Sequence, residues 1–448
     1  MSKNRKGVYF FTSLVCMYSS CFGLTKSSPD LMAVLQKAAQ NNPTYQIAVA
    51  TYRAAAQALP ISIAGVLPSL DLNSAVTKVI QTTTYNGSSN LTQKNYGLSV
   101  NQTIFNWGTF KQIAQAQASV RSAAYTLSAA GQTLMLQTAQ AYYGVLQSQD
   151  LLNYALQQFQ YISEQYAATQ KLFQHREATL PELQQARGAY ELIASQVIQA
   201  RIQLYTSYQT LEQVTAIFYP RLAPLRSNFP LVTPMPNRLD PWVEKAKTEN
   251  LTLLASEQSA LASREAIGVQ EGNYLPNITA TGSYSNGREI NTSNTSNAYT
   301  TTHFKETQAG LNAQWNIYEG GLTVAQVKQA VANYEQADAE KIQSYLSATT
   351  SARTAFTSTV LGVSEIKTIQ ASMNANTDAL IKAQKAYRAG LMTLTEILQI
   401  QNQLYQSQKE YVNDLYTYLV NMLLLEQAAG TLSLQTMLVQ NSWLNHNG

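Results

Sequence analysis

Residues 385–408 read KAYRAGLMTLTEILQIQNQLYQSQ, and they have an earlier counterpart at residues 171–196, KLFQHREATLPELQQARGAYELIASQ. A shift of 214 positions (385 − 171) places Lys171 on Lys385 and also aligns Glu182 with Glu396. Each copy lies between two long stretches that contain almost no proline, which is typical of helices. We therefore predict two helical hairpins and place these two copies at the hairpin tips.

The longest stretches of this kind are residues 109–174 and 322–388, in which Ala, Gln and Leu are frequent. These are strong helix formers, and a helix of 66 residues is about 100 Å long. Helices of that length cannot fold back into one globular core, so we expect them to lie side by side as in a coiled coil. A structural filament is the alternative interpretation, but it leaves the strand hairpins described next without a purpose.

Four shorter segments alternate apolar and polar residues, which predicts β-strands of about 11 residues. They lie around residues 70–80, 96–104, 278–284 and 309–317, with predicted loops at 85–90 and 286–302. Strands of this length fit a membrane, and lipid leaves no water for an unpaired sheet edge. Because known barrels start at eight strands, four strands predict an oligomeric barrel. A soluble four-stranded sheet packed on helices is the alternative.

The composition argues against several classes of function. Only 12% of the residues are charged, about half the usual share, and no cluster of Lys and Arg indicates a nucleic-acid binder. The three histidines, His175, His303 and His446, are isolated, and no nucleophile or metal-ligand spacing is present. The sequence therefore predicts neither an enzyme nor a cofactor.

The first 23 residues have the pattern of a signal peptide. Basic residues at positions 3, 5 and 6 precede an apolar run at 8–18, and Cys21 and Gly23 place small residues before a cleavage site at Leu24. About 11 apolar residues are too few for a membrane anchor. Lipidation of Cys21 is the alternative, although the preceding residues make a poor lipobox. No later run of 18 apolar residues exists, so we expect no transmembrane helix.

The chain divides into five parts on this evidence. They are a signal peptide (1–23), a first repeat (24–219), a proline-rich linker (220–241), a second repeat (242–432) and a tail (433–448). Each repeat is predicted to contain a helix, a β-hairpin and a long helical hairpin. Early in the repeats the matching shift is 208, which pairs Asn42 with Asn250 and Pro68 with Pro276. The fold class is therefore mainly α with a membrane β-barrel, built from a duplicated α-β-β-α unit.

Several short motifs occur in a fixed order along the two repeats. They are Asn41-Asn42-Pro43, Leu67-Pro68-Ser69-Leu70, Phe105-Asn106-Trp107-Gly108, Ile217-Phe218-Tyr219-Pro220, Tyr318-Glu319-Gly320-Gly321, and Tyr387-Arg388-Ala389-Gly390 followed by Glu396-Ile397-Leu398. In this order and spacing the mature chain resembles the TolC-like outer-membrane efflux proteins over essentially its whole length.

The resemblance implies a homotrimer with a 12-stranded barrel in the outer membrane and a 12-helix tunnel in the periplasm. It also implies contact with outer-membrane lipid, a periplasmic adaptor and an inner-membrane transporter. The expected function is passive export of small molecules or, in type I secretion, of proteins, and the residues do not select between these cargoes. The alternative is a structural or surface coiled-coil protein of the envelope that transports nothing.

The resemblance also suggests residues for a gate at the hairpin tips. Glu396 stands at an acidic position of the family's tunnel entrance, and Gln399 replaces a second acid, which would weaken a negative ring. Tyr387 and Glu182 match positions that join the hairpins, and Met392 replaces a basic partner, so that salt link is absent. Three copies of Glu396 around one axis would raise one another's pKa. The alternative for both glutamates is a solvated helix face.

A second set of tip residues is suggested for docking of the adaptor. These residues are Arg176, Pro181, Ala389, Gly390 and Leu391.

Overall fold

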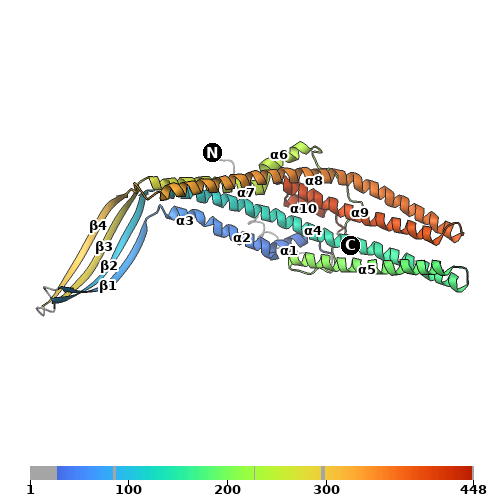
Figure 1. Ribbon diagram of the computed structural model, residues 1–448, viewed down its shortest axis with the longest axis horizontal. Coiled ribbons are helices and arrows are strands. Elements are labelled where there is room, and N and C mark those ends of the chain that lie inside the picture. The colour runs from blue at the N-terminus through green and yellow to red at the C-terminus, as the bar shows by residue number, and fades with distance from the viewer. Residues whose placement is uncertain (1–27, 84–86, 227, 294–297, 446–448) are drawn as a thin grey trace, which may run out of the picture. The chain divides into compact units, whose positions relative to one another are not determined.

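The computed structural model describes residues 28–83, 87–226, 228–293 and 298–445 (Figure 1). The predicted signal peptide, including Cys21, lies outside the described residues. The chain forms two compact units, and each is made from parts of both sequence repeats. The first unit contains residues up to 50, 124–254 and those from 343 onward, and the second contains residues 51–123 and 255–342.

Helices make up most of the described chain. They are α1 (Leu31–Asn41), α2 (Pro43–Ala56), α3 (Ala58–Ala64), α4 (Trp107–Gln174), α5 (Leu180–Thr215), α6 (Leu239–Glu249), α7 (Leu251–Glu271), the short 3-10 helix η1 (Gly272–Tyr274), α8 (Leu322–Arg388), α9 (Leu394–Ala428) and α10 (Leu434–Asn441). The two long helices, α4 of 68 residues and α8 of 67, confirm the prediction from the proline-poor stretches.

The second unit contains one antiparallel sheet with the strand order β1-β2-β3-β4. Its strands are β1 (Ser69–Thr83), β2 (Gly87–Phe105), β3 (Asn277–Ser293) and β4 (Ala298–Gln314). The pairing of β2 with β3 joins the two repeats, and Leu98 lies opposite Tyr284 there.

The strands are longer than the predicted 11 residues, at 15 to 19. The prediction of a loop at 286–302 was wrong for most of its length, because the polar residues of this segment pair with one another between strands β3 and β4. Asn291, for example, lies opposite Thr300. Threonine fits the pleated surface of a strand well, so a Ser/Thr/Asn-rich composition does not by itself exclude a strand.

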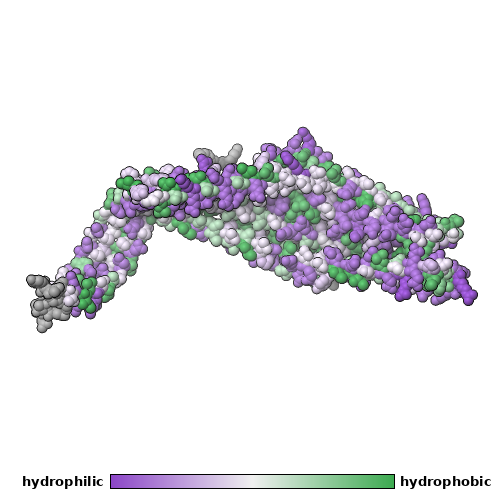
Figure 2. Space-filling view, viewed as in Figure 1, coloured by the Kyte–Doolittle hydropathy of each residue, from purple (hydrophilic) through white to green (hydrophobic). Residues whose placement is uncertain are grey.

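The sheet has one predominantly apolar face, and its two edge strands are exposed. The register brings to that face the side chains of Leu70, Leu72, Leu98, Val100, Tyr284 and Leu311. Leu72 on β1 and Leu311 on β4 are each 76% exposed. Within the described chain each of these edge strands pairs on one side only. Apolar and polar residues accordingly lie side by side on the strand surface in Figure 2.

One helical stretch, Pro43–Ala64, is long and apolar enough to cross a membrane by length and composition alone. Polar residues interrupt this stretch, so it contains no long run of consecutive apolar residues. A turn at Gln57 divides it into α2 and α3, and its apolar window is not buried inside the described chain. Ile47 and Ile61 are 65% and 71% exposed.

Buried tyrosines form the centre of the first unit and hold the linker in place. The Tyr142 hydroxyl donates to the Ala223 carbonyl at 2.7 Å, and the Tyr418 hydroxyl donates to the Val232 carbonyl at 2.6 Å. A tyrosine can be buried at little cost when its hydroxyl has such a partner. These bonds place the proline-rich linker against α4 and α9.

Helix α10, which the sequence analysis did not predict, packs on the same core. Met437 of α10 is fully buried, and the Tyr143 hydroxyl donates to the Gln440 side chain at 2.9 Å. A helix of eight residues is too short to be stable alone, so tertiary packing stabilises it.

Two asparagines that the sequence repeat pairs have the same structural role. The Asn42 side chain accepts from the Tyr45 N–H at 3.0 Å, which caps α2, and donates to the Val214 carbonyl of α5 at 2.9 Å. Asn250 caps α7 through the Leu253 N–H and donates to the Ala428 carbonyl of α9 at 3.0 Å. In each repeat one amide therefore starts a helix and ties it to the end of the returning helix.

We predict that Asn42→Ala lowers the stability of the first unit by about 1–3 kcal/mol, because it removes a cap and leaves the partly buried Val214 carbonyl without its donor. The measurement is the midpoint of thermal unfolding, followed by circular dichroism at the helical wavelength. Asn42→Ser is the matched control, since serine caps the helix but does not reach Val214. The loss of stability in this variant should be smaller than in Asn42→Ala. Equal midpoints for all three proteins would contradict this role.

Candidate functional site

The two hairpin tips have the same backbone turn. Arg176 (φ 63°) and Gly390 (φ 75°) both adopt the left-handed conformation, and they are 214 positions apart. The next N–H donates back to a helix carbonyl in both tips, from Glu177 to Leu172 at 2.8 Å and from Leu391 to Ala386 at 2.9 Å. This is the Schellman motif that ends many helices, and glycine is its preferred residue. The first tip therefore has arginine where the second has the less strained glycine.

Each returning helix begins with a capping box. In α5 the carboxylate of Glu182 accepts from the Thr179 N–H at 2.7 Å and from the Thr179 hydroxyl at 2.8 Å. In α9 Glu396 accepts from Thr393 in the same way and at the same two distances. Pro181 lies in the first turn of α5, where its missing N–H costs nothing.

These hydrogen bonds lower the pKa of both Glu182 and Glu396 from the usual value for glutamate. The backbone N–H of the capping threonine is the largest cause in both cases, followed by its hydroxyl. Within one chain both carboxylates are therefore ionised at neutral pH. The mutual repulsion expected of three Glu396 copies would act in the opposite direction.

An apolar cluster joins the two hairpins just behind the tips. We call it the tip cluster, and its buried members are Ala186, Leu380, Ala383, Leu394, Ile397 and Leu404. Ala186 comes from the first hairpin and the others from the second, and Tyr161 and Tyr166 of α4 pack against them. Tyr387 and Met392, two of the predicted gate residues, also pack against this cluster.

Two polar contacts between the hairpins were missed by the sequence analysis. The Gln185 amide donates to the Thr395 hydroxyl at 3.1 Å, and that hydroxyl lies 3.2 Å from the Gln185 carbonyl oxygen. Tyr161 of α4 forms a hydrogen bond with Gln384 of α8. Neither pair has a motif in the sequence, because the partners are more than 200 residues apart.

The remaining candidates lie at the surface of the tips. Gln399, Arg176, Pro181, Ala389 and Gly390 are exposed. Leu391 is 82% exposed, and Leu180 of the other tip is 55% exposed. The structure therefore separates the candidates into three groups: Glu182 and Glu396 in the helix caps, Tyr387 and Met392 against the tip cluster, and the others in solvent.

Farther from the tips, polar contacts continue to link α4 with α9. The Tyr416 hydroxyl donates to the Asp150 carboxylate at 2.7 Å, and the Gln147 amide donates to Asn413 at 3.0 Å. Burial raises the pKa of Asp150, and the bond from Tyr416 opposes that shift.

We predict that Glu182→Ala lowers the thermal midpoint more at pH 7 than at pH 3. The folded pKa of Glu182 is lowered, so its stabilisation is present above the unfolded value of about 4.3 and is lost as the pH falls through the folded pKa. Glu182→Gln is the control, because glutamine still accepts from the Thr179 N–H but does not titrate. If Glu182→Ala lowered the thermal midpoint equally at both pH values, the ionised carboxylate would not be the form that stabilises the cap.

Comparison with known proteins gives a match along both repeats. The model of the family described as outer membrane efflux protein matches residues 34–216 and 242–431. The chain is 28% identical over 441 residues to the outer membrane protein TolC of Escherichia coli K12, covering 96% of this chain and 88% of that protein. It is 22% identical over 409 residues to the alkaline protease secretion protein AprF of Pseudomonas aeruginosa, covering 88% of this chain and 83% of that protein.

Solved structures share the fold at lower sequence identity. The CmeC outer membrane channel of Campylobacter jejuni superposes with a TM-score of 0.78 at 18% identity, covering 95% of this chain and 94% of that one. The MtrE outer membrane channel of Neisseria gonorrhoeae, in its open state, superposes with a TM-score of 0.75 at 16% identity, covering 92% of this chain and 91% of that one. The family match spans both repeats and most of the chain, so this protein belongs to the outer membrane efflux protein family.

Proposed function

We propose that three copies of this chain assemble into one tube that crosses the outer membrane and exports cargo passively from the periplasm, with no catalytic step. The observation that carries the proposal is the four-stranded sheet, whose edge strands β1 and β4 each pair on one side only in the described chain. Lipid cannot satisfy those backbone groups, so neighbouring copies must pair with them. The number three follows from the family resemblance and gives a barrel of 12 strands.

The exposed side chains support the same assembly. Leu72 and Leu311 are on the apolar face of the sheet, where lipid would cover them. Ile47 and Ile61, on α2 and α3, are exposed in one chain and would be covered by a helix of a neighbouring copy. The two repeats, 24–219 and 242–432, would each supply two strands and one helical hairpin to the wall.

The tips are proposed as the periplasmic gate. The tip cluster and the Gln185–Thr395 contact hold the hairpins of one chain together, and separation of the hairpins would open the entrance. Three copies of Glu396 would line that entrance as a ring of negative charge and attract cations. Because Gln399 is uncharged, this ring would be weaker than one with two acidic residues from each chain.

The partners are proposed to be a periplasmic adaptor and an inner-membrane transporter. The exposed Leu391 and Leu180, with the adjacent Ala389, Gly390, Arg176 and Pro181, offer an uncovered apolar surface at the tips for an adaptor. Relatives named for protease secretion and a family named for efflux are consistent with protein or small-molecule cargo. The family match and the TolC relatives favour a channel over a structural coiled-coil protein.

The assembly predicts a detergent-extracted complex three times the mass of the mature chain. Light scattering coupled to size exclusion measures that mass, and planar bilayers measure the conductance of the same sample. Removal of β1 and β2 is a loss-of-function control, because three copies would then supply only six strands, fewer than the eight of the smallest known barrels. A monomeric, freely soluble chain without conductance would overturn the proposal.

Opening of the gate is tested by Glu396→Ala combined with Tyr387→Phe, which should raise the single-channel conductance. The change removes the carboxylate that caps α9 through Thr393 and the hydroxyl of Tyr387 beside the tip cluster, so the hairpins should separate more easily. Glu396→Gln is the control for the helix cap, because it removes the charge while the glutamine side chain still accepts a hydrogen bond from the Thr393 N–H. An unchanged conductance in the double variant would remove both residues from the gate.

A further inference from the structure

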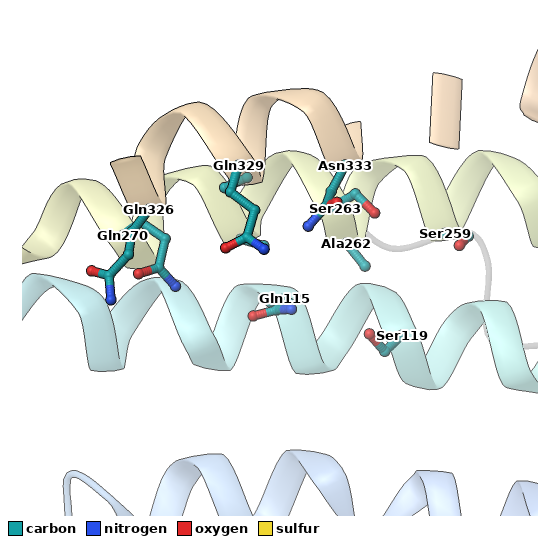
Figure 3. A pocket seen from close by; sticks show the side chains of 11 residues that line it. Gln115, Ser119, Ser259, Ala262, Ser263, Gln270, Gln326, Gln329 and Asn333 are labelled. Atoms are coloured by element: carbon teal, nitrogen blue, oxygen red, sulfur yellow. The ribbon is translucent and has the colours of Figure 1, made fainter. Parts of the chain in front are cut away.

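The second unit contains a groove between α4, α7 and α8, and its lining is uncharged (Figure 3). Carboxamides such as Gln115 and Gln326, serines such as Ser263, and alanines form this lining. A charged ligand would find no opposite charge there. The sheet of the same unit, in contrast, carries charged residues in an ordered arrangement.

The charged side chains of the sheet are sorted by sign between its two faces. The register pairs Lys94 of β2 with Arg288 of β3, and directly opposed residues of antiparallel strands share a face. Because alternate residues of a strand also share a face, Lys94 and Arg288 are on the apolar face with Leu98 and Tyr284. All lysine and arginine residues of the described strands lie on this face, and we call them the basic band: Lys78, Lys94, Arg288 and Lys305.

The acidic residues of the described strands all lie on the other face. They are Asp71, Glu289 and Glu306. Glu289, for example, is opposite Gln93, which precedes Lys94 in β2, and Asp71 is opposite Ser99. No carboxylate of the described strands therefore shares the face of the basic band, and that face is positively charged.

The basic band is accessible from outside the sheet. Lys94 and Leu98 of β2 are exposed, whereas Asn95 and Gly97, which lie between them on the other face, are half-buried and buried. Arg288 of β3 is exposed as well. The face that carries the basic band is therefore the more open one along β2, and a molecule beside the sheet can reach these side chains.

The height of the basic band matches one boundary of a membrane. Ile278, at the helix end of β3, and Arg288 are on the same face and ten positions apart (288 − 278). Ten residues extend about 33 Å along a strand, or about 25 Å across a membrane at a tilt of about 40°. The lipid-facing band of an outer-membrane barrel has that height. With the helices in the periplasm, the basic band is then level with the headgroups of the outer leaflet.

Aromatic residues occur near both boundaries. Tyr96 is two residues from Lys94 on the same face, and its hydroxyl accepts from the Asn286 side chain at 2.8 Å. Trp315, directly after β4 at the helix end, is 60% exposed. Tyrosine and tryptophan are enriched at the two interfaces of a membrane, where the ring contacts acyl chains and the polar atom contacts the headgroup region. The position of Tyr96 therefore also places the basic band at the headgroups.

We propose that the basic band binds the phosphate groups of lipopolysaccharide, the phosphorylated glycolipid of the outer leaflet. The inference rests on the proposed tube and adds a lipid-binding site to its outer surface. Arginine and lysine form charge-assisted hydrogen bonds with phosphate oxygens. The acyl chains of the same lipid would cover the neighbouring apolar side chains, such as Leu72 and Leu98. A lipid with phosphate groups fits both parts of this face, whereas a free phosphate ion would use only the charge.

The test is a titration of the purified trimer in detergent with diphosphoryl lipid A, the phosphorylated anchor of lipopolysaccharide, followed by native mass spectrometry. The basic-band variant combines Lys94→Gln, Arg288→Gln and Lys305→Gln. It removes three positive charges from each chain and should weaken the binding of lipid A at least about tenfold. Lipid A without its phosphates should bind the unaltered protein as weakly as the phosphorylated lipid binds the variant.

A charge-matched control changes three exposed basic residues of α7 and α8 in the same way. It combines Arg264→Gln, Lys328→Gln and Lys367→Gln. The affinity of this control for lipid A should equal that of the unaltered protein. If the control and the basic-band variant lost affinity equally, net charge rather than the basic band would explain the binding, and the inference would be wrong.

Two further measurements distinguish the alternatives. Inorganic phosphate at the concentration of the lipid should not displace lipid A, and displacement would indicate a site for a free anion. The permeability ratio of K⁺ to Cl⁻ in planar bilayers should not rise in the basic-band variant, and a rise would place the band inside the channel. If the unaltered protein is neither trimeric nor conducting, the proposed function fails. If it is a conducting trimer whose affinity for lipid A does not depend on the basic band, only this inference fails.

Discussion

The backbone groups along the outer edges of β1 and β4 impose the main constraint on this protein. Each edge presents a row of N–H and carbonyl groups that no strand of the described chain pairs with, beside side chains such as Leu72 and Leu311 that are three-quarters exposed. Water could satisfy the backbone but not the apolar face, and lipid could cover the face but not satisfy the backbone. Further strands from neighbouring copies would satisfy both requirements, and the proposed assembly supplies them.

In the first unit, many more of the polar groups find hydrogen-bond partners within the same chain. Its tyrosine hydroxyls reach the linker and α10, and Asn42 and Asn250 fasten the starts of α2 and α7 to the ends of the returning helices. The helical hairpins therefore extend from a well-packed core. Toward the tips the packing between hairpins reduces to the small tip cluster and a few amide and hydroxyl contacts. Such contacts are weaker than a continuous core, which suits elements that separate and return.

The glutamates at the tips have a local structural role that does not depend on any assembly. Glu182 and Glu396 complete capping boxes, so each would be useful in a helix that transports nothing. Their identical caps arise from the repeat, and the capping alone explains why an acid occurs at both positions. A role of Glu396 in the gate requires, in addition, that three copies converge on one axis.

The sequence by itself determined the long helices, the existence of four strands, the duplication and the family resemblance. These features depend on periodicity, proline content and the order of short motifs, all of which are local in the chain. The sequence was wrong on strand length, because Ser, Thr and Asn were interpreted as loop residues although they pair across β3 and β4. Only the tertiary structure decided that Gln185 meets Thr395 and that Tyr387 packs on the tip cluster. Those contacts join residues far apart in the chain, and their geometry depends on how the helices pack, which no local pattern encodes.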